Sequence, residues 1–164
     1  MTIRSCPPPL STADSAHPLS QGRYLLLRSY RRDGRAVDTP VWFLLDGDTV
    51  LLRTKIGPKT RRLTANPVVA LTVCDHRGRV RPDAPTTTGR ARILRGAEAE
   101  HANRMLHRRY GWQWNVVPLL RLPGIVNVHR GLPWREKLRR LTATRLWPDS
   151  AIVAVTVPAP SVSR

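Results

Sequence analysis

Five basic side chains fall within ten residues of the chain, and they form its strongest chemical signature. They are Arg53, Lys55, Lys59, Arg61 and Arg62, with no acidic residue among them. Pro58 suits the first turn of a short helix, which would add free backbone N–H groups, and Thr54 and Thr60 add hydroxyl donors. Cations, hydroxyls and a helix N-terminus around one loop are typical of a phosphate site. A solvated basic loop is the alternative that these residues alone leave open.

Three short strands joined by tight turns are expected to carry the chain into this segment. Residues 24–30, 36–45 and 49–54 are rich in apolar residues, and Asp-Gly pairs separate them. Because Asp-Gly favours the two-residue hairpin turn, these strands should form an antiparallel meander. Pro40 lacks a backbone N–H, which indicates an edge position or a bulge in the second strand.

Further strands and two helices are expected after the basic segment. Strand patterns cover residues 68–74, 86–94 and 151–157, and helices are expected at 96–110 and 133–147. This order fits either a single layered α+β sheet or a small barrel. The barrel is favoured because it removes exposed strand edges.

A basic insertion at residues 113–147 separates the first long helix from the last strand. Ten cations face one acid between residues 104 and 145, and four tryptophans bracket the segment. The favoured interpretation is an extra helix that packs on the barrel through Leu138, Leu141 and Trp147. A lid over an acceptor pocket, an oligomer contact and peripheral attachment to a membrane surface are the alternatives.

Composition narrows the partners and the location. Lys and Arg total 28 against 11 Asp and Glu, and the net charge of +17 predicts an anionic partner: nucleic acid, a membrane surface or a phosphorylated ligand. Nucleic acid is disfavoured because aromatic residues do not alternate with basic ones on a strand face. No stretch has the ~20 apolar residues of a membrane span, and no Cys/His spacing resembles a zinc site. Without the apolar run of a secretory signal, the protein is expected to be cytoplasmic.

The expected organisation is one domain between two tails. Residues 1–20 are polar and rich in proline without periodicity, so we expect a flexible tail there. Residues 21–158 should form the folded domain with the insertion at 113–147, and residues 159–164 a short C-terminal tail.

The order of several short motifs resembles the pyridoxamine 5'-phosphate oxidase-like split-barrel superfamily of flavin and deazaflavin proteins. The resemblance is closest to its branch of coenzyme F420-dependent oxidoreductases. It rests on residues 31–35, Thr39-Pro40-Val41-Trp42-Phe43, Arg53-Thr54, residues 59–63 and Asn66-Pro67. It continues through residues 74–78, 89–91 and 109–112, and the ordered combination is more specific than any single motif.

The resemblance implies a mainly β fold with a few helices: a six-stranded antiparallel split β-barrel of the FMN-binding type. It further implies a homodimer with the cofactor in a groove at the subunit interface. Arg53, Thr54 and Lys59 would face the cofactor phosphate, with Thr60 and Arg62 nearby. The isoalloxazine-type ring would be lined, partly through backbone groups, by Thr39, Pro40, Val41 and Trp42.

The activity that the resemblance implies is hydride transfer from reduced coenzyme F420 to a small electron-poor acceptor, with the ring chemistry supplied by the cofactor. An FMN-dependent oxidoreductase and a non-catalytic carrier of flavin, deazaflavin or haem are the alternatives. No catalytic side chain is identified. Tyr110, His107 and His76 are candidates for a proton donor, and packing or solvation is the favoured interpretation of each.

Overall fold

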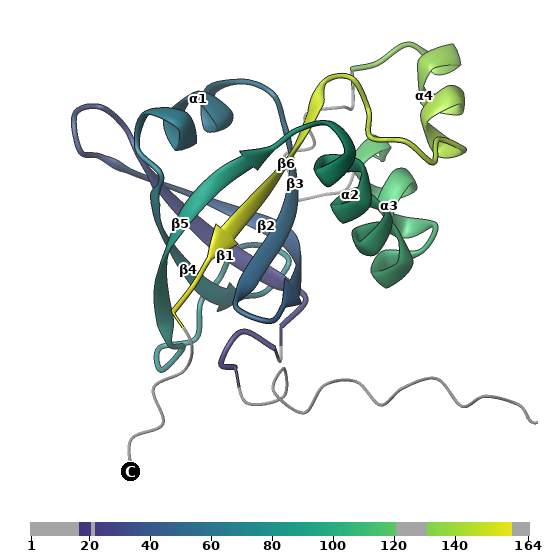
Figure 1. Ribbon diagram of the computed structural model, residues 1–164. Coiled ribbons are helices and arrows are strands. Elements are labelled where there is room, and N and C mark those ends of the chain that lie inside the picture. Colours follow the sequence, from purple (N-terminus) through teal and green to yellow (C-terminus); the bar gives the residue numbers. More distant parts are fainter. Residues whose placement is uncertain (1–16, 21, 121–130, 159–164) are drawn as a thin grey trace, which may run out of the picture.

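Six antiparallel strands form a closed barrel in the computed structural model, which describes residues 17–20, 22–120 and 131–158 (Figure 1). The strands are β1 (Tyr24–Tyr30), β2 (Ala36–Asp46), β3 (Thr49–Lys55), β4 (Val68–Cys74), β5 (Thr86–Leu94) and β6 (Ser150–Thr156). Around the barrel they follow the order β1-β2-β3-β6-β5-β4. The predicted six-stranded barrel is therefore confirmed, with each strand at its predicted place.

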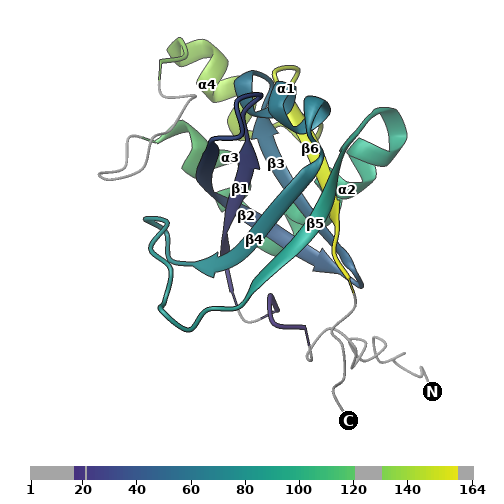
Figure 2. The same ribbon diagram turned by 90° about the vertical axis from the view of Figure 1, so that its left-hand side faces the viewer.

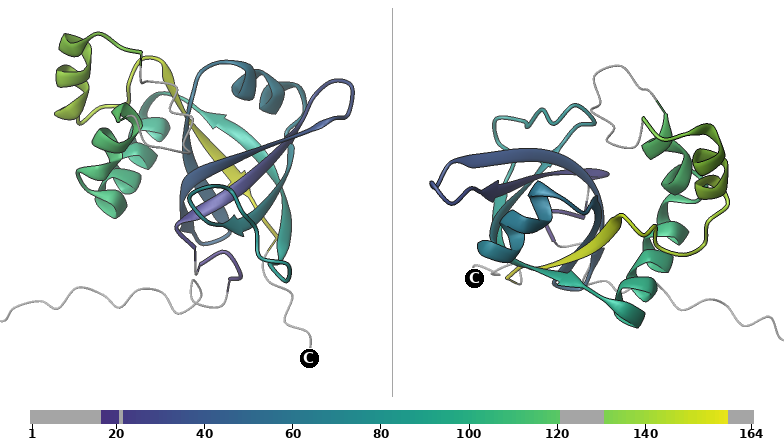
Figure 3. Two further views of the ribbon diagram at one scale, coloured as in Figure 1. Left: turned by 180° about the vertical axis from the view of Figure 1, so that it is seen from behind. Right: turned by 90° about the horizontal axis from the view of Figure 1, so that it is seen from above.

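Helices cover one end and one side of this barrel (Figure 2 and Figure 3). In the described ranges they are α1 (Pro58–Ala65), α2 (Gly96–Tyr110), α3 (Gln113–Val116), the 3₁₀-helix η2 (Val117–Leu119) and α4 (Trp134–Leu141). α1 lies across the barrel end, whereas α2, α3 and α4 gather on one side. α3 and α4 belong to the predicted basic insertion, and α2 precedes it.

The hairpin turns follow the Asp-Gly pairs of the sequence. Gly34 and Gly47 have positive φ angles of 81° and 60° in the β1–β2 and β2–β3 turns. Glycine adopts this backbone conformation without the steric cost that a Cβ atom brings. The two turns therefore produce the predicted antiparallel meander.

The barrel interior holds one apolar cluster. Residues that alternate along the strands, such as Leu25, Phe43 and Leu52, are fully buried there, and Leu63 of α1 closes the end. Leu19 is also fully buried in this cluster. The packed chain therefore begins ahead of the boundary predicted at residue 21, while residues 1–16 and 159–164 of the predicted tails lie outside the described residues.

A second apolar cluster joins the outer face of the barrel to α2 and α3. Leu51 and Ile152 of the barrel pack there against Leu106 and Tyr110 of α2 and against Trp114 of α3. Strand residues thus contribute to both clusters, because successive side chains point to opposite faces of the sheet.

The helix predicted at residues 133–147 ends earlier, at Leu141, and that prediction was too long. The side-chain amide of Asn115 donates to the carbonyls of Leu141 at 3.3 Å and Ala143 at 2.8 Å. These bonds satisfy carbonyl groups at the helix end, so the chain can leave the helix without burying unpaired acceptors. The insertion also contains α3 and η2 ahead of α4.

Only one of the three residues predicted to pack the insertion on the barrel is buried. Trp147 is 2% exposed, as predicted, but Leu138 and Leu141 are 46% and 36% exposed, so their predicted packing is wrong. Trp134, on the same helix, is 72% exposed. The membrane contact of residues 113–147 stays a prediction, and no helix in the described part of the chain has the length and apolar character to cross a membrane.

The barrel opens between β2 and β3 at the end that α1 covers. β2 pairs with β1 along residues 36–42 but with β3 only along residues 43–46, while β3 continues along β6. The Arg31 N–H donates to the Arg35 carbonyl, so antiparallel alternation turns the backbone of Pro40 away from β1. No described strand pairs with that edge, which agrees with the edge position predicted from Pro40.

Candidate functional site

The fold of α1 brings two cations to the open end of the barrel. Thr60 closes the N-terminus of the helix: its Oγ1 accepts the Gly57 N–H at 3.0 Å and donates to the Gly57 carbonyl at 2.9 Å. Leu63 is buried in the barrel and so sets the rotation of the helix. Lys59 and Arg62 then lie one turn apart on the side toward β1. The hydroxyl of Thr60 serves the helix end.

The electrostatics of Lys59 and Arg62 are those of an anion site. Burial, and then the positive charge of Arg62, lower the pKa of Lys59 to about 8. Among the described residues Lys59 has no ion-pair or hydrogen-bond partner. The Arg62 Nε donates to the Ser29 Oγ of β1 at 3.2 Å, which holds the guanidinium beside the lysine. Nothing in the local sequence marks Ser29, because its role depends on how α1 docks on β1.

Thr39 and Thr54 lie on the strands that flank the opening. Thr39 alternates with Val41 along β2, and Val41 is buried in the barrel interior. Thr54 of β3 is 8% exposed and alternates with the interior residue Leu52. Both threonines therefore face inward at the end that Lys59 covers. The structure thus places both predicted residues on the inner face of the barrel.

Arg53 lies on the opposite face of β3 and is not brought to this site. Its guanidinium is packed between the rings of Trp114 and Trp147, 4.0 Å and 4.5 Å from their centroids. It also donates to the carbonyl of Trp114. Burial lowers the pKa of Arg53 to about 9, and the nearby Asp149 carboxylate opposes the shift. Arg53 thus anchors the insertion to the barrel.

The predicted ring-lining residues of β2 divide between three environments. Val41 is buried in the barrel interior, and Trp42 stacks on Tyr110 with ring centroids 4.7 Å apart. Pro40 is exposed at the free strand edge, near Gly78. The side chain of Thr39 and the backbone at Pro40 therefore remain available at the opening.

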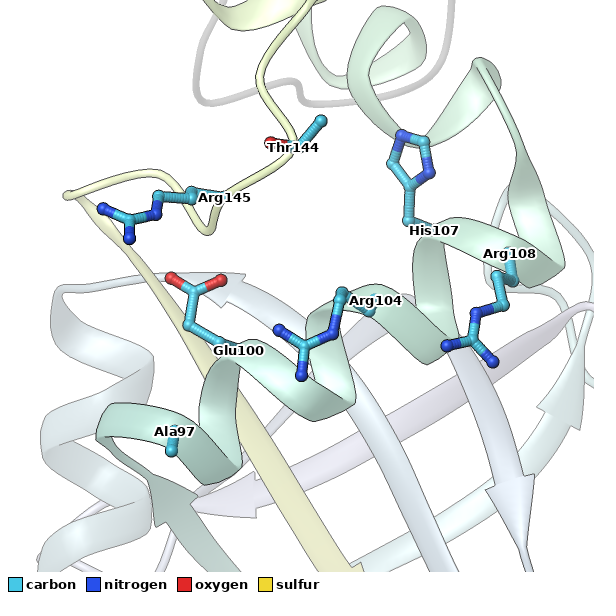
Figure 4. A pocket seen from close by; sticks show the side chains of 7 residues that line it. All are labelled: Ala97, Glu100, Arg104, His107, Arg108, Thr144 and Arg145. Atoms are coloured by element: carbon cyan, nitrogen blue, oxygen red, sulfur yellow. The ribbon is translucent and has the colours of Figure 1, made fainter.

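The candidate proton donors are mostly committed to structure. The Tyr110 hydroxyl accepts the Phe43 N–H at 3.0 Å and donates to the Phe43 carbonyl. His76 is exposed in the turn after β4, and His107 lines a pocket on α2 away from the barrel end (Figure 4). No described group of His, Cys, Asp and Glu residues has the arrangement of a metal site.

Comparison with known proteins defines the class to which this fold and site belong. The family model of pyridoxamine 5'-phosphate oxidase matches residues 16–127. The chain therefore belongs to the pyridoxamine 5'-phosphate oxidase family. No curated protein matches the chain in sequence.

Solved structures with several biochemical roles share the fold. The haem storage protein HutZ from Vibrio cholerae has 11% identity and a TM-score of 0.55, over 86% of this chain and 85% of that one. An FAD-binding protein from Mesorhizobium loti has 14% identity and a TM-score of 0.53, over 91% of each chain. A relative of general stress protein 26 from Clostridium acetobutylicum, of the pyridoxinephosphate oxidase family, has 13% identity and a TM-score of 0.52, over 88% and 81%. At such identities these likenesses show the fold alone.

Proposed function

We propose that this chain is an oxidoreductase that binds coenzyme F420 and transfers hydride from its reduced form to a small electron-poor acceptor. The observation that carries the proposal is the half-buried Lys59, which has no partner among the described residues and lies beside Arg62. A cation that burial has stripped of water is costly until an anion pairs with it. A cofactor phosphate supplies that anion.

The residues around the opening divide the work of holding such a cofactor. Lys59 and Arg62 bind the phosphate with charge-assisted hydrogen bonds. Thr39, Thr54 and the free backbone edge at Pro40 orient the ring and keep water from one of its faces. The bound deazaflavin supplies the hydride chemistry, and the protein supplies position and electrostatics.

The choice of cofactor rests on the motif resemblance and on charge. Coenzyme F420 carries an acidic oligoglutamate tail, and the chain has a net charge of +17. FMN also offers a phosphate to Lys59 and Arg62, but it carries no such tail. The two cofactors should therefore differ in the salt dependence of binding more than in their need for Lys59.

The first test is a titration of the purified protein with oxidised F420 and with FMN at low and high salt. Lys59→Ala should weaken binding of the preferred cofactor at least about tenfold, because it removes a charge-assisted phosphate contact. Lys55→Ala is the matched control, since Lys55 is exposed at the end of β3, and should stay within about twofold.

Each outcome of the titration has a definite meaning. Preference for F420 supports the proposal, whereas preference for FMN keeps the site and changes the cofactor. If Lys59→Ala and Lys55→Ala bound the cofactor with equal affinity, the phosphate would bind at another place on the protein. An enzyme is separated from a carrier by mixing the protein and reduced F420 with enones or nitro compounds, because only an enzyme accelerates reoxidation of the deazaflavin.

We also propose that the protein is a homodimer and that the partner completes the groove at the opening. Light scattering during size-exclusion chromatography measures the mass, with and without cofactor. A monomer that binds cofactor at full affinity would remove the subunit interface from the proposal while leaving the phosphate site in place.

A further inference from the structure

An open pocket on the other side of α1 is not used by the proposed cofactor site. It has a volume of about 980 Å³ and lies between α1, the start of α2 and the residues that lead into β6. Much of its lining is apolar, including Leu94, Ala99, Leu146 and Trp147. A pocket of this size with apolar lining suits a small organic molecule.

Four arginines line the same pocket: Arg32, Arg61, Arg95 and Arg145. None of them forms an ion pair with any described residue. Glu100 also lines it, but its carboxylate accepts the Leu146 backbone N–H at 3.3 Å. The pocket therefore has an excess of positive charge next to apolar surface.

The excess charge continues along α2. A neighbouring pocket of about 630 Å³ shares Glu100 and Arg145 and adds Arg104 and Arg108 (Figure 4). Figure 4 shows the Glu100 carboxylate directed toward the segment that carries Arg145. The glutamate thus ties that segment to α2, and the arginines around it remain available to an anion.

Ser150 adds a polar residue to this lining. It is 6% exposed, and its Oγ is closed to solvent and has no hydrogen-bond partner among the described residues. A buried hydroxyl without a partner costs about 1–3 kcal/mol.

We propose that this pocket binds an organic anion that has an apolar body and one acidic group. The apolar lining buries the body, and the arginines pair with the acidic group. A bare inorganic anion would leave the apolar lining uncovered, and a neutral molecule would leave the guanidinium groups unpaired. The site is separate from the phosphate site, because Arg61 and Thr64 line it from the side of α1 that faces away from Lys59 and Arg62.

Fluorescence titration with a pair of matched probes tests this proposal on the full chain. The probes are 8-anilinonaphthalene-1-sulfonate and N-phenyl-1-naphthylamine, which share an aromatic body but differ in the sulfonate. The sulfonate probe should bind more tightly, and Arg95→Gln/Arg145→Gln should weaken it at least about fivefold while changing the neutral probe less than about twofold. Ile56→Asn, at an exposed lining position, should weaken both probes because it removes apolar surface.

The control removes the same charge elsewhere. Arg77→Gln/Arg90→Gln changes two exposed arginines that do not line the pocket and should leave both probes within about twofold. Equal losses in the two double variants, or equal affinity for the two probes, would overturn the proposal. F420 or FMN binding should be unchanged in Arg95→Gln/Arg145→Gln, and sulfonate binding should persist in Lys59→Ala, so this inference and the proposed function can fail separately.

Discussion

Two groups of cations have opposite surroundings in the fold. On the insertion side, Arg53 lies between two tryptophan rings, and Arg140 forms ion pairs with Glu136 and Asp149 at 2.9 Å each. At the barrel end, Lys59 has no partner among the described residues. Other protein groups thus pair with or pack on both cations of the first group, whereas no described residue pairs with Lys59.

The difference shows which basic residues are available for binding. A guanidinium between aromatic rings contributes cation–π energy to packing, and a paired one has its charge neutralised nearby. Arg53 and Arg140 therefore hold the insertion on the barrel. A half-buried lysine beside another cation does not stabilise the empty protein, and its position makes sense when an anion binds.

The largest effect is expected when the aromatic stack on the insertion side is broken. Trp114 is 2% exposed and contacts Trp42, Tyr110 and Arg53. Trp114→Ala should lower the free energy of unfolding by about 3–5 kcal/mol, because it removes a buried ring and leaves a cavity. Denaturant unfolding measures the change.

Trp112→Ala is the control for that variant, because Trp112 is 69% exposed two positions away. It should change the free energy of unfolding by less than about 0.5 kcal/mol. If both variants lost the same stability, the stack would not be what holds the insertion. If Trp114→Ala also abolished cofactor binding by the folded protein, the two regions would not be independent.

A smaller effect is expected from the hydroxyl of Tyr110. Tyr110→Phe removes the partner of the Phe43 N–H and carbonyl and should lower the free energy of unfolding by about 1–3 kcal/mol. Tyr30→Phe, whose hydroxyl has no hydrogen-bond partner among the described residues, should have little effect. Normal stability of Tyr110→Phe with lost turnover would instead make the hydroxyl a proton donor.

The barrel could be predicted because its signals are local. The Asp-Gly pairs specified the hairpins, and alternation specified which strand residues enter the core. The placement of Lys59 and Arg62 on one face of the short helix could also be predicted, because residues three apart share a helix face. These features depend on neighbours in the chain.

The remaining features depend on contacts that distant segments make. Arg53 and Thr54 were predicted to face one phosphate, although adjacent strand residues point to opposite faces. The rings that enclose Arg53 come from residues 114 and 147, and the amide that ends α4 comes from Asn115. The sequence around Arg53 or Leu141 does not indicate these partners. The packing of the insertion determines both the surroundings of Arg53 and the end of α4.

The pH dependence of cofactor binding should be the smallest effect, and it tests the availability of Lys59 directly. The ammonium is protonated below its pKa of about 8 and neutral above it, whereas the phosphate of either cofactor is already anionic at pH 7. Cofactor affinity should therefore fall about fivefold from pH 7 to pH 9. The fall is smaller than that expected for a permanently neutral Lys59, because a bound phosphate raises the pKa of the lysine and helps it to keep its proton.

Lys59→Arg should keep the cation at both pH values, since a guanidinium holds its proton to higher pH than an ammonium does, so its affinity should be nearly flat. Unfolding cannot account for a fall in the wild type. The unfolded chain has the ordinary, higher lysine pKa and binds more protons above pH 8, so this group makes the ligand-free fold more stable as the pH rises. If cofactor affinity changed equally with pH in the wild type and in Lys59→Arg, the titrating group would be a different residue. The absence of a partner for Lys59 would then not explain cofactor binding.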